Sequence, residues 1–154
     1  MDKRDLEQLL SDVAGGSVAP ADALTRIQTA PTADLGFAQL DLSRGVRQGA
    51  GEVVYGAGKT AEQIAAIIEA LHDAGQERIL VTRLDAEKAD RTSELLDNGI
   101  DLGYVPDAQL ALVGGKPSPT GNGRIVVACA GTSDLPVAEE AALTAEFYGN
   151  EVDR

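Results

Sequence analysis

Three adjacent polar residues near the C-terminus, Thr132, Ser133 and Asp134, have side chains that suit a nucleotide or another small anion. They follow an apolar run over 125–130, and a helix with Pro136 in its first turn is predicted directly after them. Hydroxyls and free backbone N–H groups at a helix start suit a phosphate, and a carboxylate suits a ribose hydroxyl or a ring amine. The same residue types are also common N-caps, and on local grounds that plainer interpretation is favoured by roughly two to one.

Cationic residues close to the ends of predicted strands form a second group of candidate ligand-binding residues. Arg44 and Arg47 lie three residues apart after a short predicted strand, and Lys59 and Arg83 follow two further predicted strands. Guanidinium and ammonium groups at such positions bind carboxylates or phosphates. For any single one of these residues, a scattered surface cation is an equally good interpretation.

The segment Gly56-Ala-Gly-Lys-Thr60 contains Gly-Lys-Thr, which invites comparison with a nucleotide-binding P-loop. A P-loop requires a further glycine upstream, at the position that Val53 occupies here, so the pattern fails. Thr60 followed by Gln63 instead matches a helix capping box. We weigh the capping interpretation at roughly four to one over a P-loop.

Cys129 is the only cysteine, which excludes an internal disulfide and a cysteine metal cluster. It lies in the apolar run and has no histidine near it in sequence, so a buried, inert thiol is about three times as well supported as a nucleophile. No spacing typical of metal ligands occurs in the chain, and we expect no metal site.

The elements that must position these residues predict an α/β fold. Two short amphipathic helices, over 3–14 and 17–29, form a helical lead-in. Residues 52–99 read as a β-α-β-α unit, 101–105 as a further strand, and 110–113 as either a strand or part of a connection. We therefore divide the chain into a helical lead-in (1–36), a small N-terminal α/β domain (37–113), a Gly/Pro-rich linker (114–123) and a strand–helix unit (124–154).

Composition narrows the functional classes. Asp and Glu total 25 against 13 Lys and Arg, which gives a formal net charge of −12. Because an acidic surface repels a phosphate backbone, we do not expect the protein to bind nucleic acid. Only four of the cations are Lys. Adaptation to a host with high internal salt explains this acidic, lysine-poor composition as well as an ordinary solvated acidic surface does. The chain contains neither a run of membrane-spanning length nor an apolar N-terminal signal, and we expect a cytoplasmic protein that does not bind membranes.

An ordered series of short motifs resembles one protein family. It runs through Leu40-Asp-Leu-Ser-Arg44, Arg47-Gln-Gly49, Glu52-Val-Val-Tyr55, Gly58-Lys-Thr60, Thr82-Arg83 and Gly131-Thr-Ser-Asp-Leu-Pro-Val-Ala-Glu-Glu-Ala141. The last motif is similar to the first strand–turn–helix of the aminoimidazole ribonucleotide carboxylase superfamily. The upstream motifs are similar to the N-terminal domain of the LarB-type nickel-pincer cofactor biosynthesis proteins. The resemblance spans about residues 41–154 and implies the start of a parallel, flavodoxin-like, three-layer carboxylase domain.

The resemblance implies an enzyme that carboxylates the pyridinium ring of nicotinic acid adenine dinucleotide and hydrolyses its phosphoanhydride, releasing AMP. CO2 or bicarbonate would be the co-substrate, no cofactor would be tightly bound, and an assisting Mg²⁺ is left open. Ser133 and Asp134 would contact the nucleotide. The full set of expected substrate-binding residues is Asp41, Arg44, Arg47, Arg83, Thr132, Ser133 and Asp134, in which the arginine roles are inferred from charge.

Family members continue through a complete carboxylase-like domain and use a cysteine from its later part as nucleophile, so Cys129 does not inherit that role. We therefore expect this chain to be C-terminally incomplete, inactive alone, and homo-oligomeric when complete. Its catalytic residues are unknown from these 154 residues. An aminoimidazole ribonucleotide carboxylase of purine biosynthesis and a non-catalytic nucleotide-binding or assembly module are the alternatives.

Overall fold

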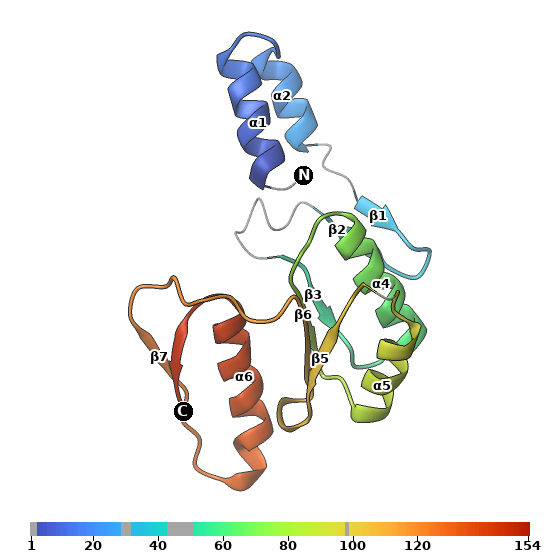
Figure 1. Cartoon of the computed structure of the whole chain (residues 1–154), viewed down its shortest axis with the longest axis vertical. Coiled ribbons are helices and arrows are strands. Elements are labelled where there is room, and N and C mark those ends of the chain that lie inside the picture. Colours follow the sequence, from blue (N-terminus) through green and yellow to red (C-terminus); the bar gives the residue numbers. More distant parts are fainter. Residues whose placement is uncertain (1–2, 29–31, 43–50, 98) are drawn as a thin grey trace.

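A computed structural model describes residues 3–28, 32–42, 51–97 and 99–154 of the chain (Figure 1). At its centre is a four-stranded sheet in the order β3-β4-β6-β5. The strands are β3 (Val53–Tyr55), β4 (Ile79–Thr82), β5 (Leu102–Val105) and β6 (Leu110–Val113). β3 and β4 are parallel, whereas β6 is antiparallel to both of its neighbours, so the sheet is mixed.

The strands bury side chains on both faces of this sheet. Along β4, Ile79 and Val81 enter one hydrophobic cluster and Leu80 enters another. Successive side chains of a strand point to opposite faces, so two separate clusters require cover on each side. The continuous apolar composition of β4 and β6 thus reflects a central position in the sheet.

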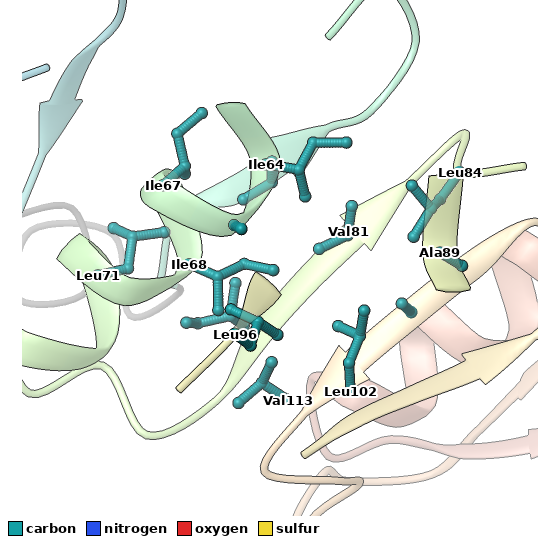
Figure 2. Close-up of a cluster of buried hydrophobic side chains, with 14 of the residues drawn as sticks. Ile64, Ile67, Ile68, Leu71, Val81, Leu84, Ala89, Leu96, Leu102 and Val113 are labelled. Atoms are coloured by element: carbon teal, nitrogen blue, oxygen red, sulfur yellow. The ribbon is translucent and has the colours of Figure 1, made fainter. Parts of the chain in front are cut away.

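Helices α4 (Ala61–Asp73) and α5 (Ala86–Leu95) cover the first face (Figure 2). Ile64, Ile68 and Leu71 recur at helical spacing on α4 and are fully buried. The predicted capping box is confirmed: the Thr60 hydroxyl accepts from the Gln63 backbone N–H at 3.2 Å, and the Gln63 side chain accepts from the Thr60 N–H at 3.0 Å.

Helix α6 (Leu135–Phe147) covers the opposite face of the sheet (Figure 1). Leu143 and Phe147 on α6 join the cluster that contains Leu80, Leu110 and Leu112. The described chain is therefore a helix–sheet–helix arrangement, and the predicted α/β fold class is confirmed.

Helix α6 also connects two short parallel strands, β7 (Arg124–Val126) and β8 (Glu151–Asp153). The strand predicted over 125–130 is thus shorter than expected. A second strand completes a βαβ unit where we had expected one strand and one helix. Parallel pairing across a crossover helix is the building pattern of flavodoxin-like sheets.

Two smaller elements precede the central sheet. β1 (Thr32–Asp34) and β2 (Gln39–Asp41) form an antiparallel hairpin, whose Leu40 enters the cluster under α4 and α5. Before them, α1 (Lys3–Ala14) and α2 (Pro20–Gln28) form the predicted helical lead-in, at one end of the long axis in Figure 1. None of the described helices is long and apolar enough to cross a bilayer.

The segment 110–113 is strand β6, which resolves the alternative between a strand and a connection. The division of the chain into lead-in, domain, linker and strand–helix unit stays a prediction. Residues 114–123, the predicted linker, lie between β6 and α6 in the sequence. The apolar side chains of α6 are nevertheless buried in the same cluster as those of β4 and β6.

Candidate functional site at the carboxyl edge of the sheet

The carboxyl ends of β3 and β4 lie side by side because the two strands are parallel and in register, with Tyr55 opposite Thr82. The loops that follow them lead into α4 and α5. The backbone N–H of Gly56 donates to the Thr82 carbonyl at 2.7 Å. A Cβ at Gly56 would lie 2.9 Å from that oxygen, so only glycine allows the two loops to approach this closely.

Arg83 is the central side chain of this edge. Its φ of 54° places it in the left-handed region, which costs a residue with a Cβ about 1–2 kcal/mol. Its Nε lies 3.0 Å from Oε2 of Glu140 on α6. The Arg83 side chain is about half exposed (47%), and its terminal nitrogens have no partner among the described residues. Strained backbone held by its surroundings is typical of functional positions.

Two lysines approach the same edge. The ammonium of Lys59 donates to the Tyr55 carbonyl at 3.0 Å. The ammonium of Lys88 donates to the next carbonyl, that of Gly56, at 3.4 Å and pairs with Asp85 at 3.3 Å. The carboxyl edge of β3 therefore carries two cations on consecutive carbonyls.

The start of α5 is held by Asp85 and Tyr104. The Asp85 carboxylate caps α5 by accepting from the Lys88 backbone N–H at 2.8 Å, and this hydrogen bond, more than the Lys88 ammonium, lowers the pKa of Asp85. The Tyr104 hydroxyl donates to the Leu84 carbonyl at 3.0 Å. Its pKa is raised by burial first and by the Asp85 and Asp90 charges second, so it remains a neutral donor at physiological pH.

The turn at 131–134 differs from a plain helix cap. Residues 132–134 form a single 3-10 turn, and Asp134 occupies the N-cap position of α6 without a side-chain capping hydrogen bond. The interpretation of Ser133 or Asp134 as a capping side chain is therefore wrong. Thr132, Ser133 and Asp134 are all exposed, and the turn is closed by a backbone bond from Asp134 N–H to the Gly131 carbonyl at 3.0 Å.

The remaining predicted site residues are spread over the chain. Asp41 ends β2 and is half-buried, whereas Arg44 and Arg47 lie outside the described residues. The structure brings Arg83 to α6, the helix that follows the Thr132–Asp134 turn, through its ion pair with Glu140. The substrate-binding roles of all seven residues stay predictions.

Cys129 is exposed, so the prediction of a buried thiol is wrong. The physical reason is that β7 ends at Val126, three residues earlier, and its own residues Ile125 and Val126 are exposed as well. An apolar run is buried only where another element covers it, and among the described residues none covers this stretch. Within the described chain, no three His, Cys, Asp or Glu side chains gather as metal ligands would.

Sequence reasoning missed Glu140 and Lys88. Lys88 carried a local signal, because it lies three residues after the cap Asp85 and can turn back toward it. Glu140 carried none, since its contact with Arg83 depends on how α6 packs against the sheet.

A sequence model of the family described as "LarB/PurE-like N-terminal domain" matches residues 32–114, more than half of the chain. "Uncharacterized protein MJ0165" of Methanocaldococcus jannaschii is 32% identical over 115 residues, which make up 73% of this chain and 45% of that protein. The chain thus spans less than half the length of this relative. The match over 32–114 includes β1 to β6, together with α4, α5 and the carboxyl edge described above. The chain therefore belongs to the LarB/PurE-like N-terminal domain family.

Proposed function

We propose that the chain is part of a LarB-type synthase of nickel-pincer cofactor biosynthesis. The substrate would be nicotinic acid adenine dinucleotide. One step replaces a ring C–H by a carboxylate, with CO2 or bicarbonate as carbon source and release of the ring proton. The other adds water across the phosphoanhydride, giving AMP and the carboxylated mononucleotide. The family match carries this proposal.

The carboxyl edge supports an anionic substrate of this kind. In a chain with a net charge of −12, the terminal guanidinium nitrogens of Arg83 have no partner among the described residues, and two lysines, Lys59 and Lys88, donate to backbone carbonyls at the end of the neighbouring strand β3. A guanidinium binds a carboxylate or phosphate through two parallel hydrogen bonds. Arg83 would thus bind a phosphate or the ring carboxylate.

The turn before α6 would bind the nucleoside part of the substrate. Thr132 and Ser133 offer exposed hydroxyls, and Asp134 offers a carboxylate that no capping bond occupies. Asp41, Arg44 and Arg47 complete the proposed binding set on sequence grounds. The nucleophile would be a cysteine other than Cys129, and the protein that contains this chain would be a cytoplasmic homo-oligomer.

Binding is the first test, because it does not require the catalytic cysteine. Titration of the chain with nicotinic acid adenine dinucleotide in a calorimeter should give saturable binding. Arg83→Gln should weaken it at least tenfold, since a charged hydrogen bond is lost. Arg78→Gln is the matched control: Arg78 precedes β4 as Arg83 follows it, and it is also exposed. Equal effects of the two substitutions would contradict the proposed role of Arg83.

Turnover is the second test. The chain, and a version extended to the length of its relative, should be incubated with the dinucleotide and ¹³C-bicarbonate and followed by mass spectrometry. Labelled carboxylated mononucleotide and AMP from the extended version would support the synthase. Carboxylation of aminoimidazole ribonucleotide would indicate the purine-pathway enzyme instead. Saturable binding without either reaction would indicate a nucleotide-binding module.

A further inference from the structure

The backbone on both sides of Arg83 is fixed by hydrogen bonds. The Thr82 carbonyl accepts from the Gly56 N–H at 2.7 Å, and the Leu84 N–H donates to the Gln109 carbonyl at 2.8 Å. The Leu84 side chain is also fully buried. The backbone of Arg83 is therefore held in place, and the conformational freedom left in this residue is that of its long side chain.

Glu140 restrains that side chain from helix α6. Its Oε2 lies 3.0 Å from Nε of Arg83, and the Glu140 side chain is only 20% exposed. Leu143 and Phe147 follow Glu140 three and seven residues later, so the three residues share one face of α6. Leu143 and Phe147 are buried in the cluster that α6 forms with the sheet. The packing of α6 thus determines where the Glu140 carboxylate lies.

The ion pair engages the inner nitrogen of the Arg83 guanidinium. A guanidinium has five N–H donors in a fixed, planar arrangement, of which Nε carries one and the two terminal nitrogens carry the rest. The terminal nitrogens of Arg83, Nη1 and Nη2, have no partner among the described residues. Two such nitrogens donate side by side to two oxygens of one carboxylate or phosphate. Glu140 and an anionic ligand can therefore use different nitrogens of the same guanidinium.

We propose that Glu140 is a positioning residue for anion binding at Arg83, and that it holds the guanidinium so that Nη1 and Nη2 bind a carboxylate or phosphate group of the ligand. This inference rests on the proposed function, in which Arg83 binds a phosphate or the ring carboxylate of the substrate. An arginine side chain has many rotamers, and a guanidinium that is already held loses less conformational entropy when a ligand binds. Glu140 would thus raise the affinity for an anion although it is itself an anion.

The alternative role, that of a plain counterion, predicts a change of affinity with the opposite sign. A carboxylate beside an anion site repels the anion and competes with it for the guanidinium. If Glu140 acted only through its charge, its removal would strengthen ligand binding. If Glu140 positions Arg83, its removal frees the guanidinium to move and weakens ligand binding. The sign of the change in affinity therefore separates the two roles.

The test is isothermal titration calorimetry of the full chain with nicotinic acid adenine dinucleotide and, separately, with inorganic pyrophosphate. Glu140→Ala should weaken binding about fivefold, the loss expected when one flexible side chain must be ordered by the ligand. Glu140→Gln keeps an oxygen at this position and should weaken binding only about twofold. In an Arg83→Gln background, Glu140→Ala should have no further effect, because its influence on the ligand passes through Arg83.

Glu139→Ala is the matched control. Glu139 precedes Glu140 on α6 and also pairs with an arginine at 3.0 Å, but its partner is Arg154, which follows β8. The control variant should keep the affinity within about twofold of the original chain, since a surface ion pair contributes little to the fold. An equal effect of Glu139→Ala and Glu140→Ala would overturn the positioning role.

The two probes separate this inference from the proposed function. Dinucleotide binding that Glu140→Ala leaves unchanged or strengthens would overturn the positioning role and leave the proposed function intact. Pyrophosphate binding that weakens from the original chain through Glu140→Gln to Glu140→Ala, without binding of the dinucleotide, would keep the role of Glu140 and reject the proposed function. Absence of saturable binding of both probes would overturn both.

Discussion

Arg83 and Glu140 are joined by a 3.0 Å ion pair between Nε and Oε2. Arg83 lies inside the residues that match the family, and Glu140 lies outside them, on the helix of the βαβ unit. The pair thus connects the carboxyl edge of the central sheet to the segment that carries the Thr132–Asp134 turn. A substrate that binds the Arg83 guanidinium would therefore contact a side chain whose position depends on Glu140 of α6.

Arg83 should reveal its backbone strain through substitution. Arg83→Gly and Arg83→Ala both remove the ion pair, but only glycine adopts φ 54° without a steric cost. We expect the glycine variant to be about 1 kcal/mol more stable than the alanine variant in urea unfolding. At Arg78, where φ is not positive, the order should be reversed. Equal stability of the two Arg83 variants would show that residue 83 carries no strain.

Helix α6 should be held to the sheet chiefly by Phe147. Its side chain is buried against Leu80, Leu110 and Leu112, and truncation leaves a cavity there. Phe147→Ala should lower the free energy of unfolding by about 3–5 kcal/mol. Val137, on the same helix but exposed, provides the control, and Val137→Ala should change it by less than about 0.5 kcal/mol. Similar effects at the two positions would contradict the observed packing of α6.

Two threonines should respond to the same substitution with opposite signs. The Thr92 hydroxyl is fully buried and has no hydrogen-bond partner within the described residues. Thr92→Val replaces it with a methyl group of similar size and should stabilise the chain by about 1 kcal/mol. Thr60→Val removes the capping hydroxyl and should destabilise it by about 1 kcal/mol. Denaturant midpoints for both variants, measured side by side, would check the signs.

Glu146 should make stability depend on pH at acidic values. Its pKa lies below the ordinary 4.5, first because Arg154 donates to it at 2.6 Å and then because Lys116 donates at 2.7 Å. A lowered pKa in the folded state gives stability above the unfolded-state pKa that is lost as pH falls through the folded-state value. Glu146→Gln should therefore be less stable than the original chain at pH 7, with the gap closing below pH 4.5. A gap that is constant from pH 7 to pH 3 would contradict this origin.

Local patterns were sufficient to predict most elements. Helical spacing predicted α1 and α2, and the capping box of Thr60 and Gln63 marked the start of α4 correctly. These signals lie within a few residues of each other, so no knowledge of tertiary structure is needed to read them. The polar candidates at the ends of β3 and β4 followed from the same strand boundaries.

Features that depend on contacts across the chain were missed or mispredicted. The ion pair of Arg83 with Glu140 requires α6 to dock on the sheet, and nothing near Glu140 in sequence signals this. Cys129 was expected to be buried because its neighbours are apolar, but burial depends on a covering element. The Thr132–Asp134 turn lacks a side-chain cap although its residue types favour one, because a 3-10 turn takes the place of that cap.

The packing of α6 has a consequence for biosynthesis. The sheet is complete in sequence once Val113 has been made, but Leu110 and Leu112 remain without their cover until Phe147 follows, 34 residues later. At about 5–20 residues per second, the ribosome needs roughly 2–7 s to add that stretch. During this interval the nascent chain presents an apolar sheet face to its surroundings. A chaperone that binds β-strand segments would therefore find its substrate between these two points of synthesis.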